Sequence, residues 1–245
     1  MSKSFGQVAA LRDVSLRAPR AAVTCLLGDN GAGKSTLIKL LSGVFRPDEG
    51  TVLVNGREAS FRSPRHALDS GVSTVFQDLA TIPLMSIVRN FFLGREPTRG
   101  PGLRLVDWGR AERITRDSLA EMGIALRDAS QPVGTLSGGE RQSLAIARAL
   151  HFGASVLILD EPTSALGVRE AANALRHVQA VRDQGLAVIL ITHNVAHAYA
   201  VGDYFVVLDR GAVVAERGRD EVTSQELQEL MAGGGAMEQL LRPVS

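Results

Sequence analysis

One short run constrains the fold of this chain more than any other feature. Residues 28–35 read GDNGAGKS and fit the pattern G-x-x-x-x-G-K-[ST]. Glycines let a backbone wrap closely round a phosphate chain, because they carry no Cβ atom. The turned loop aims its N–H groups inward, and the N-terminal end of a following helix also attracts an anion. The apolar run 23–27 is a predicted strand and 34–45 a predicted helix, so the flanks disfavour a chance match.

The side chains of this run predict a site for ATP and Mg²⁺. Lys34 supplies a cation for the β- and γ-phosphates, and the Ser35 hydroxyl coordinates Mg²⁺, with Thr36 beside it. The residues expected to contact the nucleotide here are Gly28, Asn30, Gly31, Gly33, Lys34, Ser35 and Thr36.

Two acidic residues close a later apolar run. Residues 156–159 read VLIL and are followed by Asp160 and Glu161. Carboxylates at the carboxyl end of a parallel strand lie where ligands bind in doubly wound sheets. Asp160 is expected to hold Mg²⁺ through water, and Glu161 to orient and polarise the attacking water. The alternative is an ordinary solvated strand end, which the phosphate-binding loop upstream disfavours.

Strand and helix patterns alternate over most of the chain, which predicts a largely parallel sheet covered on both faces by helices. Further strands are predicted at 51–54, 72–76, 187–191 and 204–208. Further helices are predicted at 169–184 and 195–200, and from 222 onward until a glycine break at 233–235. Between about Asp78 and Phe152 the strand signals fade, and helical spacing predicts an insert with helices at 87–93, 108–122 and 140–150.

Length and composition narrow the class further. The 245 residues suffice for one α/β domain with a smaller insert. A formal net charge of +1 argues against bulk electrostatic attraction to nucleic acid. The longest apolar runs fall far short of the ~18 residues that suggest a membrane-spanning helix, and the start of the chain has no apolar region typical of a secretory signal. Cys25 lies in an apolar run and is expected to be a buried small hydrophobe in a reducing cytoplasm.

Residues 136–142 read LSGGERQ and resemble the signature of the ABC (ATP-binding cassette) ATPases, LSGG followed by Glu or Gln. Ser137 and the glycines open a predicted helix that runs to Leu150, where close backbone approach and the helix end suit an anion. In isolation such a run is most often a turn or a helix cap. Here it lies between the phosphate-binding loop and the acidic strand end, as it does in that family.

Other landmarks also resemble this family. Gln77 follows a predicted strand and resembles the glutamine that acts in catalysis and on the metal, and His193, after the predicted strand 187–191, resembles the switch histidine. Phe5 resembles the aromatic residue that stacks on adenine, with simple packing as the alternative. The other histidines fall on predicted helices, where a surface or core role is expected: His66, His151, His177 and His197.

The resemblance implies a particular α/β architecture. It implies a P-loop NTPase core with a mainly parallel sheet, an N-terminal antiparallel β portion and an inserted α-helical subdomain. The whole chain, 1–245, is then one domain, whose parts are a core with its β portion (1–77 and 153–231), a helical insert (78–152) and a C-terminal tail (232–245). Only four residues precede Phe5, so the family's first strand is expected to be shortened here.

The resemblance also implies an assembly. Two copies form a head-to-tail homodimer, with ATP sandwiched between the phosphate-binding loop of one copy and Ser137, Gly138 and Gly139 of the other. The expected place is the cytoplasmic face of the inner membrane, as a peripheral subunit bound to integral membrane permease subunits. A periplasmic or extracellular sugar-binding protein is an indirect partner, and no nucleic acid is expected.

One departure bears on the substrate. After residue 166 the family usually has Asp, and this chain has Gly167, which puts a contact between the two nucleotide sites in question. The run 165–170, ALGVRE, resembles the ribose and fructose class of importers, and 76–80 and 86–94 resemble its single-cassette fructose type. We therefore expect the ATPase of a sugar importer. The alternatives are the ATPase of a non-sugar transporter or exporter, a soluble ABC ATPase acting on nucleic acid or ribosomes, and a regulatory cassette without turnover.

Overall fold

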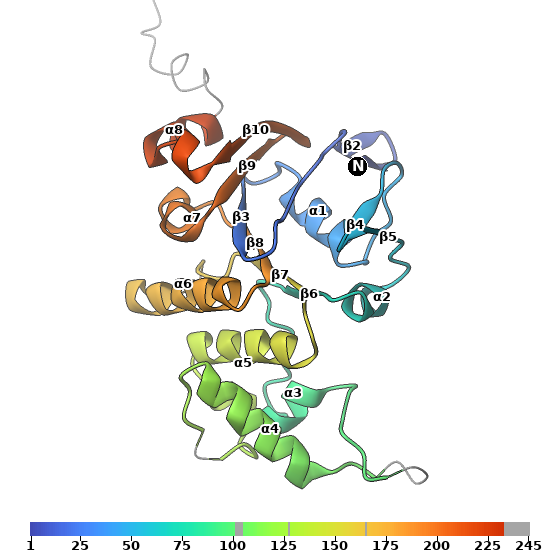
Figure 1. The fold of residues 1–245 in the computed structure, drawn as a ribbon, viewed down its shortest axis with the longest axis vertical. Coiled ribbons are helices and arrows are strands. Elements are labelled where there is room, and N and C mark those ends of the chain that lie inside the picture. Colours follow the sequence, from blue (N-terminus) through green and yellow to red (C-terminus); the bar gives the residue numbers. More distant parts are fainter. Residues whose placement is uncertain (101–104, 127, 165, 233–245) are drawn as a thin grey trace, which may run out of the picture.

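The computed structural model describes residues 1–100, 105–126, 128–164 and 166–232. At its centre is a six-stranded sheet in the order β10-β9-β3-β8-β7-β6 (Figure 1). The strands are β3 (Ala22–Leu27), β6 (Val72–Val75), β7 (Val156–Asp160), β8 (Ala187–Ile191), β9 (Tyr204–Asp209) and β10 (Ala212–Gly218). Neighbours from β6 to β9 pair in parallel, and β10 pairs antiparallel with β9 at one edge. The expected, largely parallel α/β fold is confirmed.

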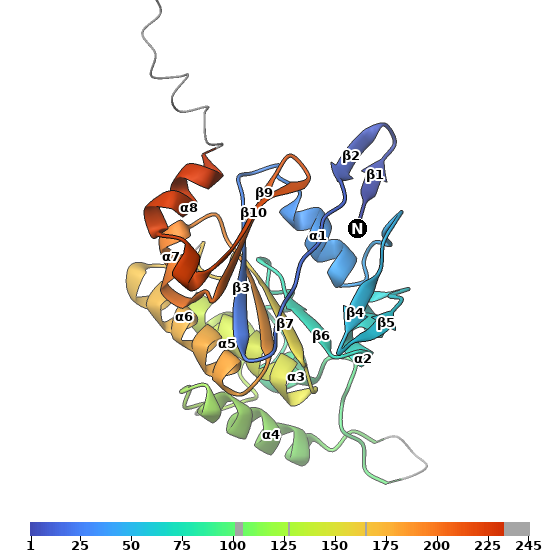
Figure 2. The same cartoon turned by 45° about the horizontal axis from the view of Figure 1, so that its top comes forward.

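Helices cover both faces of this sheet, because alternate strand residues point to opposite sides. In β3, Val23, Cys25 and Leu27 belong to the apolar cluster on one face, and Leu26 belongs to the cluster on the other. The helices of the first face are α3 (Ile87–Phe92), α4 (Trp108–Glu121), α5 (Gly138–His151), α6 (Val168–Asp183), α7 (Val195–Val201) and α8 (Ser224–Met231). On the second face lie α1 (Lys34–Leu41) and α2 (Pro64–Asp69). Figure 2 shows α1 and α6 on opposite sides of the sheet.

Two antiparallel hairpins lie on the side of α1, as expected for the N-terminal β portion. One pairs β1 (Lys3–Phe5) with β2 (Val8–Leu11), and the other pairs β4 (Val52–Val54) with β5 (Arg57–Ala59). The residues ahead of Phe5 thus contribute to a short strand that is paired along its length.

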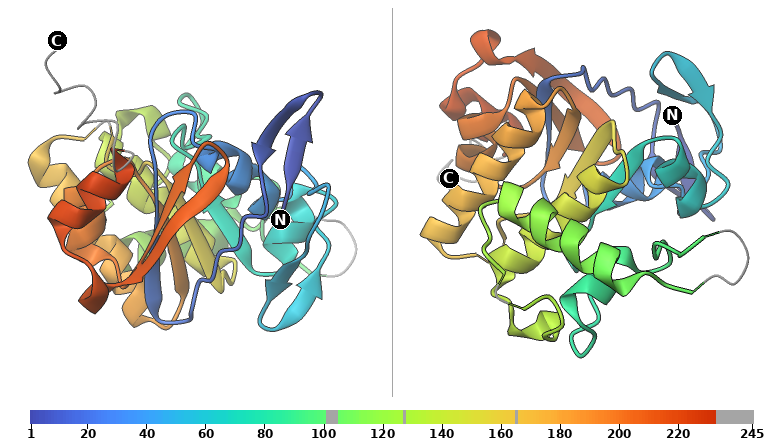
Figure 3. Two further views of the ribbon diagram at one scale, coloured as in Figure 1. Left: turned by 90° about the horizontal axis from the view of Figure 1, so that it is seen from above. Right: turned by 60° about the horizontal axis from the view of Figure 1, so that its bottom comes forward.

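The helical segment between β6 and β7 occupies one end of the molecule, drawn in green and yellow-green in Figure 3. It contains α3, α4, a 3₁₀ turn at Val133–Thr135, and α5, and its described residues add no strand to the sheet. Helix α5 also packs against α6 and the edge strand β6, so the apolar cluster on this face runs from the insert into the sheet. No helix in the described part of the chain is long and apolar enough to cross a membrane.

Several boundaries differ from the predictions. The helix predicted over 34–45 ends at Leu41, because Ser42 caps it and Gly43 takes a left-handed conformation with φ of 73°. Helix α2 was missed although Ser63 and the proline after it form a typical helix start. Strands β1, β2, β5 and β10 were also missed, and β10 is an edge strand in which Ala215 alone is buried. The predicted glycine break and the residues 233–245 of the predicted tail lie outside the described residues.

Candidate active site

The loop 28–33 connects β3 to α1, and two of its glycines are required by close neighbours. A Cβ atom on Gly28 would lie 2.3 Å from the carbonyl oxygen of Leu208, and one on Gly33 would lie 2.9 Å from that of Ala10. Gly33 also has φ of 108°, which side chains rarely adopt. Strand β9 and the end of β2 therefore press the loop into its turn.

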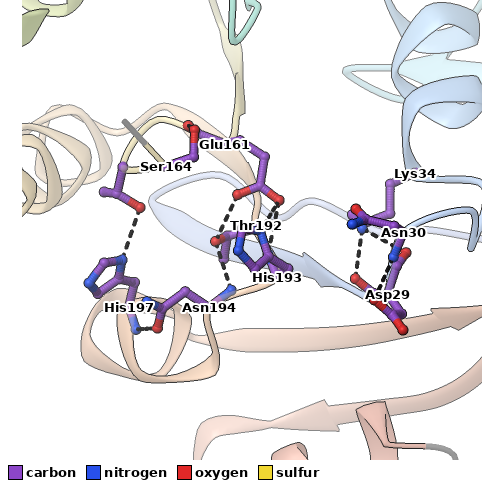
Figure 4. Close-up of polar contacts among 11 residues, drawn as sticks. Asp29, Asn30, Lys34, Glu161, Ser164, Thr192, His193, Asn194 and His197 are labelled. Carbon is purple, nitrogen blue, oxygen red and sulfur yellow. Dashed lines mark hydrogen bonds and ion pairs between the residues drawn. The ribbon is translucent and has the colours of Figure 1, made fainter. Parts of the chain in front are cut away.

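Lys34 lies inside this turn. Its Nζ donates to the carbonyl oxygens of Gly28 at 2.6 Å and Asp29 at 3.0 Å, so the buried side chain runs along the loop (Figure 4). The Asp29 carboxylate accepts a hydrogen bond from the backbone N–H of Asn30 at 2.7 Å. Ser35 is exposed and Thr36 half-buried in the first turn of α1. The N-terminal end of that helix and a cation thus face the same concave loop.

Three neighbouring strands end at the same edge of the sheet with polar side chains. The register pairs Val75 of β6 with Leu159 of β7, and Asp160 of β7 with Ile191 of β8. Gln77 and His193 each follow two residues after these strand positions. The carboxyl edge of β6, β7 and β8 therefore gathers the glutamine, the acidic pair and the histidine beside the phosphate-binding loop after β3.

Asp160 and Glu161 lie in different surroundings although they are adjacent. Asp160 is half-buried, and burial raises the pKa of its carboxyl, with the charge of Glu161 adding to this and Lys34 opposing it. A second cation near Asp160 would stabilise its ionised form. The oxygen atoms of Asp160 and Ser35 are also the ligands that Mg²⁺ prefers, so these residues fit that ion. In the described residues no three His, Cys, Asp or Glu side chains gather into a metal-binding group.

The Glu161 carboxylate is fixed by the strand end beside it. Oε1 accepts from the backbone N–H of His193 at 3.0 Å and lies 2.8 Å from Nδ1 of the same residue, and Oε2 accepts from the Thr192 hydroxyl at 3.2 Å (Figure 4). The Glu161 side chain is 13% exposed and that of His193 58%. The glutamate thus has a fixed oxygen pair near the surface, which is what a base for a bound water requires.

The signature residues lie elsewhere. Ser137 caps α5: its hydroxyl accepts from Glu140 N–H at 3.2 Å, and the Glu140 carboxylate accepts from Ser137 N–H at 2.7 Å. Ser137 is exposed, and Gly139 has open space around it. Because α5 and α1 pack on opposite faces of the sheet, the structure does not bring the signature to the phosphate-binding loop of its own chain.

The remaining predicted residue is Phe5, at the end of β1. Its ring is 44% exposed and packs edge-on against Phe45 with 5.2 Å between ring centroids. The Lys3 ammonium lies 5.6 Å from the centroid of the same ring, so Phe5 is partly packed and partly exposed. Gln77 is also exposed.

Sequence reasoning missed the residues that support Glu161. Thr192 and Asn194 flank His193, and Thr163 lies two residues after Glu161. Thr192 and Thr163 are buried, and each makes a side-chain hydrogen bond. Their only signal in the sequence is a cluster of hydroxyl and amide side chains at two neighbouring strand ends, which is also ordinary loop composition.

The sequence is also similar to those of known proteins. A profile of the ABC transporter family matches residues 11–164. The chain is 42% identical to the xylose/arabinose import ATP-binding protein of Sulfolobus acidocaldarius, over 94% of this chain and 90% of that protein. It is 44% identical to the fructose import ATP-binding protein of Rhizobium meliloti, over 82% and 79%. A ribose import ATP-binding protein of Streptomyces avermitilis is 40% identical over 95% of this chain, which spans 46% of that protein.

Solved structures share the fold. The ADP conformation of an ATP-binding cassette of an ABC transporter superposes with a TM-score of 0.82 at 24% identity, covering 98% of this chain and 96% of that one. A dimeric cassette in a post-hydrolysis state with ADP and Pi gives a TM-score of 0.73 at 24% identity, covering 89% and 95%.

Proposed function

Because this chain belongs to the ABC transporter family, we propose that it is the ATP-hydrolysing subunit of a sugar importer. The observation that carries the proposal is the meeting of the phosphate-binding loop with a fixed glutamate at one edge of the sheet. Three relatives that each cover at least four-fifths of this chain are named as import proteins for xylose/arabinose, fructose and ribose, which supports a sugar over other cargo.

The loop 28–35 holds the triphosphate of ATP. The nucleotide contacts come from Gly28, Asn30, Gly31, Gly33, Lys34, Ser35 and Thr36. Lys34 leaves its carbonyl partners for the β- and γ-phosphates, and the backbone N–H groups and helix end complete the anion site. Phe5 supplies an aromatic face for adenine, in keeping with its exposed ring.

Ser35, Gln77 and Asp160 would hold Mg²⁺ beside this loop. The ion, when bound, neutralises charge on the phosphates. The chain's own contribution is to present hard oxygen ligands and to place Glu161 next to them without making it a ligand. Burial raises the pKa of Asp160, and Mg²⁺ bound beside it would favour the ionised carboxylate.

Glu161 orients and polarises the attacking water, and His193 and Gln77 complete the group. The Thr192 hydroxyl and the backbone N–H and ring Nδ1 of His193 contact the carboxylate, whose two oxygens together offer about four lone pairs, so one remains for a water proton. His193, more exposed than Glu161, reaches outward beside it toward the γ-phosphate.

The signature supports a head-to-tail homodimer. Since Ser137, Gly138 and Gly139 lie on the face opposite α1, a second copy must supply them to each bound ATP. ATP then joins two copies, and hydrolysis releases them. Membrane permease subunits, a sugar-binding protein on the far side of the membrane and a cytoplasmic-face location complete this proposal.

The test of nucleotide binding compares Lys34→Ala with Lys39→Ala. Lys39 lies on the same helix but is exposed, with its ammonium over the Phe45 ring. We expect Lys34→Ala to abolish tight binding of a fluorescent ATP analogue and Mg²⁺-dependent ATP hydrolysis, and Lys39→Ala to retain both. Normal affinity in Lys34→Ala contradicts the assignment of the loop.

The substrate class is tested separately. The chain is reconstituted in proteoliposomes with candidate permease and solute-binding subunits, and ATP turnover is measured with pentoses, hexoses and amino acids. Stimulation by a sugar supports the proposal, and stimulation by a non-sugar ligand alone overturns the substrate class while leaving the ATPase intact.

A further inference from the structure

Four hydrogen bonds and the backbone between them form a closed circuit. It joins the chain after β7, at Glu161, to the chain after β8, at His193, through a second histidine, His197. We propose that His197 is a positioning residue for ATP hydrolysis, which anchors the chain after Glu161 to the chain after β8. This inference rests on the proposed ATPase function and concerns the same site. The sequence alone favours a packing or surface role for His197.

One half of the circuit runs through the His197 ring. Its Nδ1 lies 2.9 Å from the hydroxyl oxygen of Thr163, two residues beyond Glu161. Thr163 is 6% exposed and His197 half-buried, so water competes little for this bond. The backbone after the glutamate is therefore tied to helix α7 by a side chain of that helix.

The other half returns to the glutamate. The His197 backbone N–H donates to the Asn194 side-chain oxygen at 3.0 Å, and the Asn194 N–H donates to the Thr192 hydroxyl at 3.0 Å. That hydroxyl donates to Glu161 Oε2 at 3.2 Å. Figure 4 shows Glu161, Thr192, Asn194 and His197 around this circuit.

The circuit fixes the one proton of the Thr192 hydroxyl. Since this oxygen accepts from Asn194 N–H, its proton is free to point at the Glu161 carboxylate. A displaced α7 would disturb both the acceptor at Asn194 and the donor at Thr192. The carboxylate orientation thus depends on where the start of α7 lies.

The backbone of Glu161 needs such support. Its φ is 48°, a left-handed conformation that a residue with a side chain adopts only where its surroundings enforce it. Its N–H donates to Ile191 O at 2.9 Å, and its carbonyl accepts from the Ser164 N–H and hydroxyl. Thr163, between these anchors, has its hydroxyl bound to His197. The imidazole therefore stabilises the turn that aims the glutamate, without touching the carboxylate.

The geometry gives a test that depends on which ring nitrogen is used. Asparagine places its amide near the position of Nδ1, and glutamine places it near Nε2. We expect His197→Asn to keep kcat within about twofold of wild type. His197→Gln and His197→Ala should lower kcat about tenfold, the effect of losing roughly one hydrogen bond in the transition state. The KM for ATP should not change, because no nucleotide-binding residue is altered.

Unequal activity of Asn and Gln variants with matched thermal midpoints supports positioning. Equal kcat in all three variants, or losses that track thermal stability alone, overturn it. A control, His66→Gln, changes an exposed histidine on α2 and should leave kcat unchanged.

The partner residue gives an independent measurement. Thr163→Val removes the hydroxyl with little change in shape, and Thr163→Ser keeps it. We expect Thr163→Val to lower kcat as much as His197→Gln does, and Thr163→Ser to retain the wild-type kcat. The double variant Thr163→Val/His197→Gln should have a kcat no lower than that of either single variant. Additive losses in the double variant contradict the proposal. If the wild type does not hydrolyse ATP, the proposed function fails. If the wild type hydrolyses ATP and the variants do so equally fast, only this inference fails.

Discussion

At the residue scale, the most informative position is Glu161. Its place after a buried strand was predictable from the run 156–161, and the phosphate-binding loop upstream favoured a functional role over an ordinary solvated strand end. Its left-handed backbone and its hydrogen bonds to Thr192 and His193 were not predictable, since they depend on the pairing of β7 with β8. The chemical role assigned to Glu161 stays a prediction.

The substitution Glu161→Gln tests that role. The amide keeps the size of the side chain but cannot take a proton from water, so kcat should fall at least ~100-fold while ATP affinity persists. ATP should then hold two copies together, which light scattering in size-exclusion chromatography detects. Glu58→Gln, an exposed change on β5, is the matched control. Unchanged turnover in Glu161→Gln would refute the general-base role.

Gly28 makes a second prediction at this scale. The Cβ atom of Gly28→Ala would collide with the Leu208 carbonyl oxygen on β9, and backbone cannot move aside as a side chain can. We expect lower thermal stability and at least ~10-fold weaker ATP binding, on the order of one displaced phosphate contact. Gly56→Ala is the control, because Gly56 also has a positive φ, 75° against 151° at Gly28, but has open space around it. Equal effects of the two substitutions contradict the steric argument.

At the scale of elements, strong periodicity predicted what packing later used. The strand 187–191 and the helices near 108–122 and 169–184 agree closely with β8, α4 and α6, because β8 is buried along its length and the two helices bury residues at regular helical spacing. Short elements such as α2, β1 and β5 were missed, since a few residues carry too little pattern. The predicted end of α1 was wrong because a glycine turn, rather than a loss of apolar spacing, ends the helix.

The contact between α5 and α6 predicts a dependence of stability on pH. His177 on α6 lies 3.1 Å from the Ser143 hydroxyl on α5, and burial lowers the pKa of its imidazole, with Arg176 adding to this and a backbone hydrogen bond at Met122 opposing it. The unfolded chain therefore binds a proton at a higher pH than the folded chain. Stability from this group is present above the ordinary pKa of about 6.5 and is lost as pH falls toward the folded value.

Urea unfolding at about pH 7.5 and about pH 5.5 measures this effect. The loss of unfolding free energy on acidification should be smaller in His177→Gln than in wild type. His66→Gln, at an exposed site, should keep the wild-type dependence. A dependence that is identical in all three proteins contradicts the prediction.

At the scale of the whole molecule, the two faces of the sheet separate the two halves of the proposed reaction site. The phosphate-binding loop leads into the α1 face, and the signature opens a helix on the other. The sequence predicted both motifs and the fold, but this separation follows only from the alternation of strand side chains in three dimensions. The division into core, insert and tail stays a prediction.

Mixing two inactive variants tests whether each ATP site is shared between two copies of the chain. Lys34→Ala damages the loop alone, and Gly139→Asp adds a negative charge where a side chain has room. Each should be inactive by itself, whereas an equal mixture should recover about a quarter of wild-type turnover, from one intact site in each mixed dimer. Recovery scaled to protein concentration supports the dimer, and an inactive mixture with both variants folded contradicts it.

The position of β3 in the sheet has a consequence for biosynthesis. This early strand lies between β8 and β9, which pair with it from more than two-thirds of the way along the chain. While a ribosome extends the polypeptide, the phosphate-binding loop emerges first, but its strand has no neighbour until residues 187–209 have been made. A nascent chain halted before that point carries an unpaired apolar strand, so the nucleotide site is completed only after β8 and β9 have been made.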